Sequence, residues 1–329
     1  MDEIKWGIIG CGDVCEVKSG PAFDRIEGSR LVAVMRRNGD KAKDYAERHC
    51  VPKWYDDADN LINDPNVNAI YIATPPSTHI EHTLKAAAAG KPVYVEKPMA
   101  KTHEESLLMI EACEKANVPL FTAFYRRSLP NFLKVKSIIE SGLIGDVRYV
   151  NVKLNKTLEP DIVANNLGAN NWRVNPEVAG GGYFYDLASH QLDFLDFLFG
   201  PITEAYGFKS NQAGVYAAED IVSGSFRFER GVLGQGIWCF TTSRTSDEEL
   251  TTIVGSKGQL SFPFFGDHSL SLEVEGRVKE VMSFEMPKHI QQPLIQTIVD
   301  ELLGKGKSPS TGISGARTNW VMGQLTSQL

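Results

Sequence analysis

The stretch Gly7-Ile8-Ile9-Gly10-Cys11-Gly12-Asp13-Val14-Cys15 follows the first apolar run of the chain and opens its first helical pattern. Gly10 permits a tight turn, and Gly12 lets the backbone approach a ligand closely. A Gly-x-Gly-x-x-small pattern is a weak signal alone, because glycine-rich turns also occur without a ligand. A strand before it and a helix after it favour a dinucleotide site, with pyrophosphate at the helix start. The candidate cofactor-binding residues of this turn are Gly10, Gly12, Asp13 and Val14.

Short apolar runs alternate with helical patterns through residues 1–124. The expected strands are Lys5–Ile9, Leu31–Met35, Ala69–Ala73, Pro92–Val95 and Leu120–Ala123. The expected helices are near Val14–Phe23, Lys41–His49, Ala58–Asn63, Thr78–Ala89 and His103–Ala116. Nearly continuous apolar strands between helices are typical of a parallel sheet with both faces covered. Residues 1–124 are therefore expected to form an N-terminal Rossmann dinucleotide-binding domain of α/β class.

The pattern changes after Tyr125. A helix, Leu129–Ser141, is followed by a strand, a polar loop and a second helix, Tyr183–Phe199. Ile221–Phe228 and Val232–Thr241 then predict a hairpin, and the first of these strands is apolar on one side only. The sequence therefore predicts an α+β domain over 125–329, built on a large, mostly antiparallel, open-faced sheet. It leaves open whether the C-terminal helical pattern packs back on the first domain.

The composition of the chain limits the classes of partner that it can bind. The 329 residues carry a net charge of −7, which disfavours nucleic acid or an anionic membrane as the main partner. No apolar run approaches the ~20 residues that span a bilayer. The five cysteines include no C-x-x-C pair, which is typical of reduced thiols in a cytoplasmic protein, and they fit no metal-ligand spacing. We therefore expect a cytoplasmic protein that binds a small molecule and needs no metal.

The end of the second expected strand predicts the cofactor. NAD enzymes commonly place an acidic residue there, bonded to the adenosine ribose. Here Arg36 and Arg37 occupy that position, and Lys41 follows at the next helix start. Guanidinium groups pair well with phosphate oxygens, so NADP, with its 2′-phosphate, is the preferred cofactor and NAD the alternative.

Two further segments end expected strands at the sheet edge where ligands bind. The first is Ala73-Thr74-Pro75-Pro76-Ser77-Thr78-His79, and the second is Ala89-Gly90-Lys91-Pro92-Val93-Tyr94-Val95-Glu96-Lys97-Pro98. In the second domain, Trp172-Arg173 precedes Gly180-Gly181-Gly182 and then Asp186-Leu187-Ala188-Ser189-His190. Asp186 and His190 are four residues apart, so one α-helix would place them on one face.

With these motifs, nearly the whole chain resembles the Gfo/Idh/MocA oxidoreductases. The resemblance implies that Lys97 contacts substrate and assists catalysis, that Glu96 lies against the nicotinamide ribose, and that the Lys97–Pro98 peptide is cis. It implies a cofactor role for Thr74, Pro75, Trp172 and Arg173. His79 either lies beside the cofactor or fixes its loop, and both alternatives stay open.

The expected activity is NADP-dependent hydride transfer at a hydroxyl or carbonyl carbon of a sugar, polyol or sugar derivative. His190 would exchange the proton, Lys97 would bond the reacting oxygen, and Asp186 would orient His190 or bind a neighbouring hydroxyl. Tyr125 and Asn166 are candidate substrate contacts. Two alternatives are a catalytically silent dinucleotide sensor and an NAD-dependent glycosidase. A homodimer or homotetramer through the C-terminal sheet is expected.

Overall fold

The computed structural model describes residues 2–158 and 171–327, and the candidate substrate contact Asn166 lies outside them. The chain forms two compact units. One comprises Met1–Ser128 and Pro287–Ala316, and the other comprises Leu129–Met286 and Arg317–Leu329. The expected division lies between residues 124 and 125, and the sequence left open whether a C-terminal helix packs back on the first domain. In the structure, Pro287–Ala316 returns to the first unit instead.

The first unit is built on a six-stranded sheet of order β3-β2-β1-β4-β5-β6, in which every pairing is parallel. Its strands are β1 Ile4–Ile9, β2 Ser29–Met35, β3 Lys53–Tyr55, β4 Ala69–Ile72, β5 Val93–Val95 and β6 Leu120–Thr122. The expected Rossmann architecture is confirmed. The sequence did not predict β3, because three residues at the sheet edge are too few to show an alternating or continuous apolar pattern.

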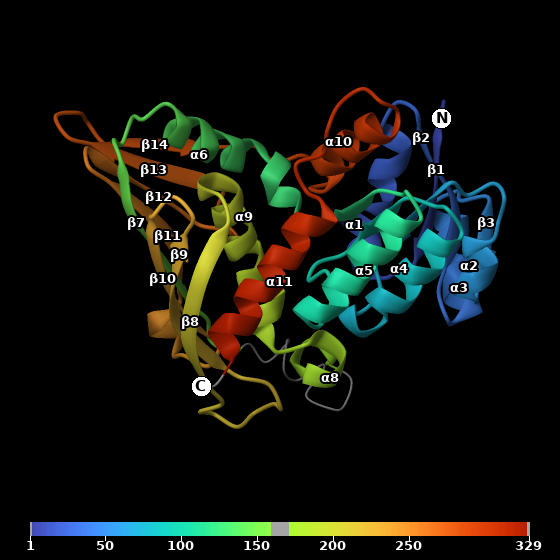
Figure 1. Cartoon of the computed structure of the whole chain (residues 1–329), viewed down its shortest axis with the longest axis horizontal. Coiled ribbons are helices and arrows are strands. Elements are labelled where there is room, and N and C mark those ends of the chain that lie inside the picture. Colours follow the sequence, from blue (N-terminus) through green and yellow to red (C-terminus); the bar gives the residue numbers. More distant parts are fainter. Residues whose placement is uncertain (1, 159–170, 328–329) are drawn as a thin grey trace. The chain divides into compact units, whose positions relative to one another are not determined.

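Helices cover both faces of this sheet (Figure 1). They are α1 Asp13–Val17, α2 Gly39–Arg48, α3 Ala58–Ile62, α4 His79–Ala88, α5 His103–Lys115 and α10 Gln292–Leu302, with 3₁₀ turns η1 Gly20–Arg25, η2 Pro76–Thr78 and η3 Tyr125–Ser128. The single helix expected over Val14–Phe23 is wrong. α1 ends at Val17, and the Cys15 carbonyl, which a longer helix would bond to the Ser19 N–H, accepts a hydrogen bond from the Tyr45 hydroxyl at 2.9 Å instead.

The second unit is built on an eight-stranded sheet of order β14-β13-β12-β11-β7-β10-β9-β8. Its strands are β7 Val147–Asn155, β8 Ile202–Ser210, β9 Ile221–Phe228, β10 Leu233–Cys239, β11 Glu248–Gly255, β12 Gly258–Phe262, β13 Ser269–Val274 and β14 Glu280–Ser283. β7 and β10 pair in parallel, and the other pairings are antiparallel. The expected mostly antiparallel sheet is confirmed, as is the β9–β10 hairpin.

Helices line one face of this second sheet (Figure 1). They are α6 Pro130–Glu140, α9 Ser189–Phe199 and the last part of α11 Gly312–Thr326. The unit also contains the short helix α8 Pro176–Ala179 and the turns η4 Trp172–Val174, η5 Phe184–Ala188 and η6 Arg244–Ser246. Gly207 and Gly224 pair across β8 and β9, and a Cβ on either would lie within 2.5 Å of Leu325. These glycines therefore let the end of α11 lie directly on the sheet.

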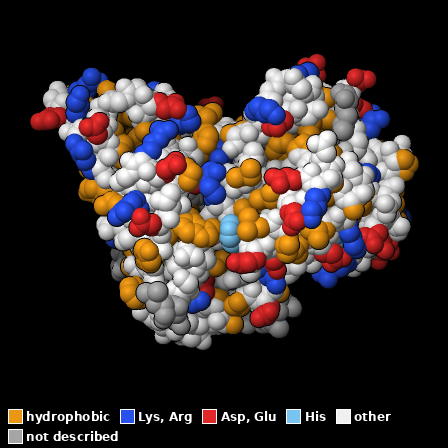
Figure 2. Space-filling model, in the orientation of Figure 1, with side chains coloured by type: hydrophobic (Ala, Val, Ile, Leu, Met, Phe, Trp, Pro, Cys, Tyr) orange, Lys and Arg blue, Asp and Glu red, His pale blue; other side chains and the backbone are white. Residues whose placement is uncertain are grey.

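On the face drawn in Figure 2, acidic and basic side chains are interspersed rather than gathered by sign. Across residues 2–158 and 171–327, no helix combines the length and the apolar composition that crossing a membrane requires.

Candidate active site

The glycine turn lies at the carboxyl end of β1. Gly10 has φ +90°, and a Cβ there would lie 2.7 Å from the Thr74 side chain and 3.0 Å from the Ala73 carbonyl. Only glycine fits this conformation and this close contact with the loop after β4. At Gly12, in contrast, a Cβ would meet nothing nearer than the Gly10 oxygen at 3.9 Å. The space over Gly12, before Asp13 and Val14 open α1, can therefore admit a ligand.

Cys11 lies between the two glycines and is fully buried. Its backbone N–H donates to the Met35 carbonyl at the end of β2, as does that of Gly10, at 3.2 and 2.9 Å. Burial raises the pKa of the Cys11 thiol to about 11. The turn is therefore fixed to β2 and presents a neutral thiol at neutral pH.

Three basic residues follow β2. Arg36 is half-buried, while Arg37 and Lys41 are exposed. Lys41 lies in the first turn of α2, where its N–H donates to the Asn38 side chain at 3.0 Å. None of the ion pairs among the described residues involves Arg36, Arg37 or Lys41. Their charge is therefore available to an anionic ligand at this end of the sheet.

His79 joins two loops. Its ring is fully buried, with Nε2 2.7 Å from the Thr74 carbonyl and Nδ1 3.1 and 3.2 Å from the carbonyls of Pro98 and Met99. Burial lowers the pKa of His79, and the hydrogen bonds to the carbonyls oppose that effect. The contacts favour the second alternative for this residue, that it fixes the Thr74-Pro75 loop to the segment after Lys97.

Glu96 and Lys97 follow β5 at the same edge. The Glu96 carboxylate is 7% exposed and accepts hydrogen bonds from the Tyr71 hydroxyl and the Gln291 amide, both at 2.7 Å, and from the Lys97 N–H at 3.1 Å. The Lys97 side chain is half-buried. The Lys97–Pro98 peptide is cis, as expected.

Tyr125 lies in η3, just after β6, and is 6% exposed. The Arg126 guanidinium lies 5.0 Å from its ring centroid and donates to its hydroxyl at 3.1 Å. The two side chains therefore support each other at the end of the last strand.

In the second unit, Trp172, Arg173 and Asp186 form one group. The Arg173 guanidinium lies 4.6 Å from the centroid of the Trp172 ring, and its Nε is 3.6 Å from the Asp186 carboxylate. The sequence predicted a cofactor role for Arg173, and in the structure Arg173 also forms this ion pair. Both side chains keep some solvent exposure, 47% for Arg173 and 24% for Asp186, so the group is accessible to a ligand.

The glycine run brings this group close to a neighbouring backbone. A Cβ on Gly181 would lie 2.2 Å from the Tyr185 ring, and one on Gly182 would lie 2.9 Å from the Glu219 carbonyl. Glu219 also accepts a hydrogen bond from the Gly182 N–H at 3.1 Å. The sequence predicted close passage at these glycines but gave no signal for Glu219 as their partner.

Asp186 and His190 do not share one continuous α-helix. The structure has a π turn, η5, over Phe184–Ala188, and α9 begins at Ser189, so the helix expected over Tyr183–Phe199 is wrong at its start. The wider π turn accommodates Tyr185, whose ring occupies the space left by Gly181. The spacing of four residues therefore does not by itself place Asp186 and His190 on one face of an α-helix.

His190 is 4% exposed, and its ring lies edge-on to Phe265 with centroids 6.2 Å apart. The loop of Phe265 is fixed by Glu249, whose carboxylate accepts hydrogen bonds from the N–H groups of Phe264 and Phe265 at 2.7 and 3.0 Å. The other Glu249 oxygen accepts from Gln191, the neighbour of His190, at 3.0 Å. Sequence reasoning missed Glu249 and Gln291, because polar residues far away in sequence carry no local signal.

No group of three His, Cys, Asp or Glu side chains suited to a metal ion occurs in the described part of the chain.

The sequence and the fold are similar to those of known oxidoreductases. Residues 4–124 match the oxidoreductase family with an NAD-binding Rossmann fold, and residues 132–261 match the GFO/IDH/MocA C-terminal domain. Oxidoreductase P35 of Formosa agariphila is 40% identical over 321 residues, which is 97% of each chain. The 1,5-anhydro-D-fructose reductase of Ensifer adhaerens is 31% identical over an alignment that spans 72% of this chain and 70% of the reductase. Levoglucosan dehydrogenase in complex with NADH and levoglucosan has the same fold, with a TM-score of 0.86 and 21% identity. The superposition covers 98% of this chain and 96% of the dehydrogenase chain.

Proposed function

Because the chain belongs to the Gfo/Idh/MocA oxidoreductase family, we propose that it transfers a hydride between NADP(H) and a hydroxyl or carbonyl carbon of a sugar, polyol or sugar derivative. One observation carries the proposal: the Gly10 turn, the Thr74 loop and Glu96-Lys97 stand at the carboxyl ends of β1, β4 and β5, which are neighbours in one parallel sheet. Ligands of open α/β sheets bind at this edge. The names of relatives that act on 1,5-anhydro-D-fructose and levoglucosan support a sugar as substrate.

The dinucleotide would lie over Gly12, with its adenosine end toward Arg36. Bound there, it supplies the hydride chemistry. Lys97 donates a hydrogen bond to the reacting oxygen and stabilises its developing charge, and His190 gives or takes the proton. Asp186, held by Arg173, orients His190 or binds a neighbouring hydroxyl. Tyr125 is a proposed substrate contact at the end of β6.

A panel of aldoses, ketoses, anhydro sugars and polyols, followed by nicotinamide absorbance with NADP(H) and NAD(H), tests this function. Turnover of free cofactor with one substrate class is the expected result. A dinucleotide sensor would bind cofactor and oxidise or reduce nothing. A glycosidase would cleave its substrate without net consumption of free cofactor.

The cofactor preference gives a separate prediction. Arg36→Asp removes a phosphate partner and adds repulsion, so affinity for NADP should fall by about 1–3 kcal/mol. The affinity for NAD, which lacks the 2′-phosphate, should change less. Fluorescence titration of both cofactors measures the difference, and Arg30→Asp, an exposed position on β2, is the control. Equal affinity of the unaltered protein for the two cofactors would contradict the assignment to NADP.

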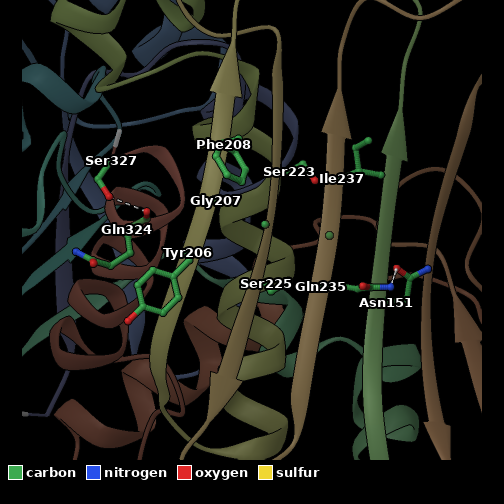
Figure 3. A pocket seen from close by; sticks show the side chains of 12 residues that line it. Asn151, Tyr206, Gly207, Phe208, Ser223, Ser225, Gln235, Ile237, Gln324 and Ser327 are labelled. Atoms are coloured by element: carbon green, nitrogen blue, oxygen red, sulfur yellow. Dashed lines mark hydrogen bonds between the residues drawn. The ribbon is translucent and has the colours of Figure 1, made fainter. Parts of the chain in front are cut away.

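We also propose that the second sheet pairs with a second copy of the chain. Its outer face displays Phe208, 85% exposed, and Tyr206, 64% exposed, on β8, and Ile237 on β10. Figure 3 shows these side chains on the strands, with Ser223, Ser225 and Gln235 between them. An apolar face with small neutral side chains and few charges suits burial against a second sheet.

Phe208→Asp should therefore convert an oligomer into a monomer, because the charge would be buried at the interface. Sedimentation velocity at micromolar concentration measures the change. Val278→Asp is the matched control, since Val278 is 87% exposed in the segment between β13 and β14, away from these strands. A monomeric unaltered protein would contradict the proposal.

We further propose a cytoplasmic location, consistent with five cysteines that are all free thiols.

A further inference from the structure

A buried polar group in the first unit links the end of β5 to a residue nearly two hundred positions later. The Gln291 amide donates to the Glu96 carboxylate at 2.7 Å, and its carbonyl oxygen accepts from the Tyr94 hydroxyl at 2.8 Å. The Tyr71 hydroxyl donates to the same carboxylate oxygen. Tyr71, Tyr94 and Gln291 are fully buried, and the two tyrosine rings are stacked with centroids 4.8 Å apart. Both the amide nitrogen and the carbonyl oxygen of the Gln291 side chain are therefore hydrogen-bonded within this cluster.

The backbone around Gln291 is fixed as well. Its N–H donates to the Lys18 carbonyl at 3.2 Å, and the His289 ring lies 2.7 Å from the Val17 carbonyl. These contacts attach the segment before α10 to the end of α1, directly after the glycine turn. Gln291 therefore has little freedom to move away from Glu96.

The charge in this cluster is not balanced locally. The three groups bonded to Glu96 are a phenol, an amide and a backbone N–H, which are all neutral donors suited to an anionic carboxylate. Burial, followed by the charge of Glu96, raises the pKa of Tyr71 and Tyr94 well above the ordinary value, so the phenols remain donors. Within residues 2–158 and 171–327, no side-chain nitrogen of Lys, Arg or His lies within 4.0 Å of the Glu96 carboxylate.

The position of the Glu96 carboxylate at the sheet edge indicates which ligand its charge would attract. With Arg36 after β2 at the adenosine end and the glycine turn after β1 in the middle, a dinucleotide bound in the proposed way would extend toward β4 and β5. Its other end is the nicotinamide, which is a cation when oxidised and neutral when reduced. A buried carboxylate at this edge attracts the first form and has no net attraction for the second.

We propose that Gln291 is a positioning residue for Glu96, and that the fixed carboxylate makes the site favour the oxidised over the reduced nicotinamide cofactor. The proposal rests on the proposed cofactor site. It explains why the chain returns to the first unit at Pro287: the returning segment carries the group that fixes the charge.

The test compares dissociation constants for NADP⁺ and NADPH, measured by calorimetric titration without substrate. Glu96→Gln should weaken NADP⁺ binding relative to NADPH by about tenfold, since it removes one partly buried charge interaction. Gln291→Leu keeps the volume and frees the carboxylate, so it should shift the same ratio by about threefold. Gln296→Leu on α10 is the matched control and should leave the ratio unchanged, because within the described ranges the Gln296 side chain bonds only to Asp300 of the same helix, at 2.9 Å.

Tyr94→Phe gives a second, milder variant, which removes only the hydroxyl that bonds Gln291. It should shift the ratio in the direction of Gln291→Leu. A purely structural role for Gln291 would weaken both cofactor forms equally, and that result would overturn the inference while leaving the proposed function standing. Failure of the unaltered protein to bind either form would overturn the proposed function and this inference together.

Discussion

Replacing His190 by Ala is expected to lower turnover by roughly 10²–10⁴-fold, the usual range for a positioned acid–base group. The affinity for NADP should change little, because His190 lies in the second unit and holds no part of the dinucleotide in the proposed scheme. Steady-state kinetics with the substrate found in the panel, together with a cofactor titration, separates the two effects.

His268→Ala is the control for this substitution. His268 is an exposed histidine three residues after Phe265, so it tests whether losing any imidazole near this loop matters. Normal turnover in the His190 variant would assign the proton transfer to another group and reduce Asp186 and His190 to structural residues.

The largest loss of stability is expected for Arg317→Met. Arg317 forms two hydrogen bonds to the Asp196 carboxylate through its Nε, at 3.0 and 3.2 Å, and the Asp196 side chain is only 2% exposed. Removing the guanidinium takes a hydrogen-bonded cation away from a buried carboxylate, and breaking a buried pair in this way costs roughly 3–5 kcal/mol. Chemical denaturation should show a lower free energy of unfolding for the second unit.

The double variant Asp196→Leu/Arg317→Met checks the cause. Removing both charges should restore most of the stability, because the penalty comes from burying a carboxylate that has lost the Arg317 cation rather than from loss of the pair itself. A double variant as unstable as Arg317→Met would mean that the packing of α11 on α9, not the charge, accounts for the loss.

The sequence predicted those parts of the fold that local patterns encode. Gly10-x-Gly12 between a strand and a helix fixed the start of the Rossmann sheet, and one-sided burial in β9 predicted the open-faced sheet. The Glu96-Lys97-Pro98 motif predicted the cis peptide through family resemblance. In each case the signal lies within about ten residues.

Parts that depend on distant contacts were missed. The Gly182 N–H just before the π turn at Phe184–Ala188 donates to Glu219, 37 residues later, and the Cys15 carbonyl in α1 accepts from Tyr45, 30 residues later. Gln291 and Glu249 are ordinary polar residues whose partners become evident only in three dimensions. No pattern of spacing in the sequence could have assigned them to a site.

The return of Pro287–Ala316 to the first unit also orders events during synthesis. When residues up to Ser128 have left the ribosome, all six parallel strands are present, but Gln291 and α10 have not yet been made. Tyr94 and Glu96 then lack Gln291 as a partner, and α10 does not yet cover its surface of the first unit. A chain cut short before Pro287 would keep the glycine turn and lose the amide that bonds Glu96. The hydrogen bonding around Glu96 is therefore completed only by a segment that is translated long after the sixth strand.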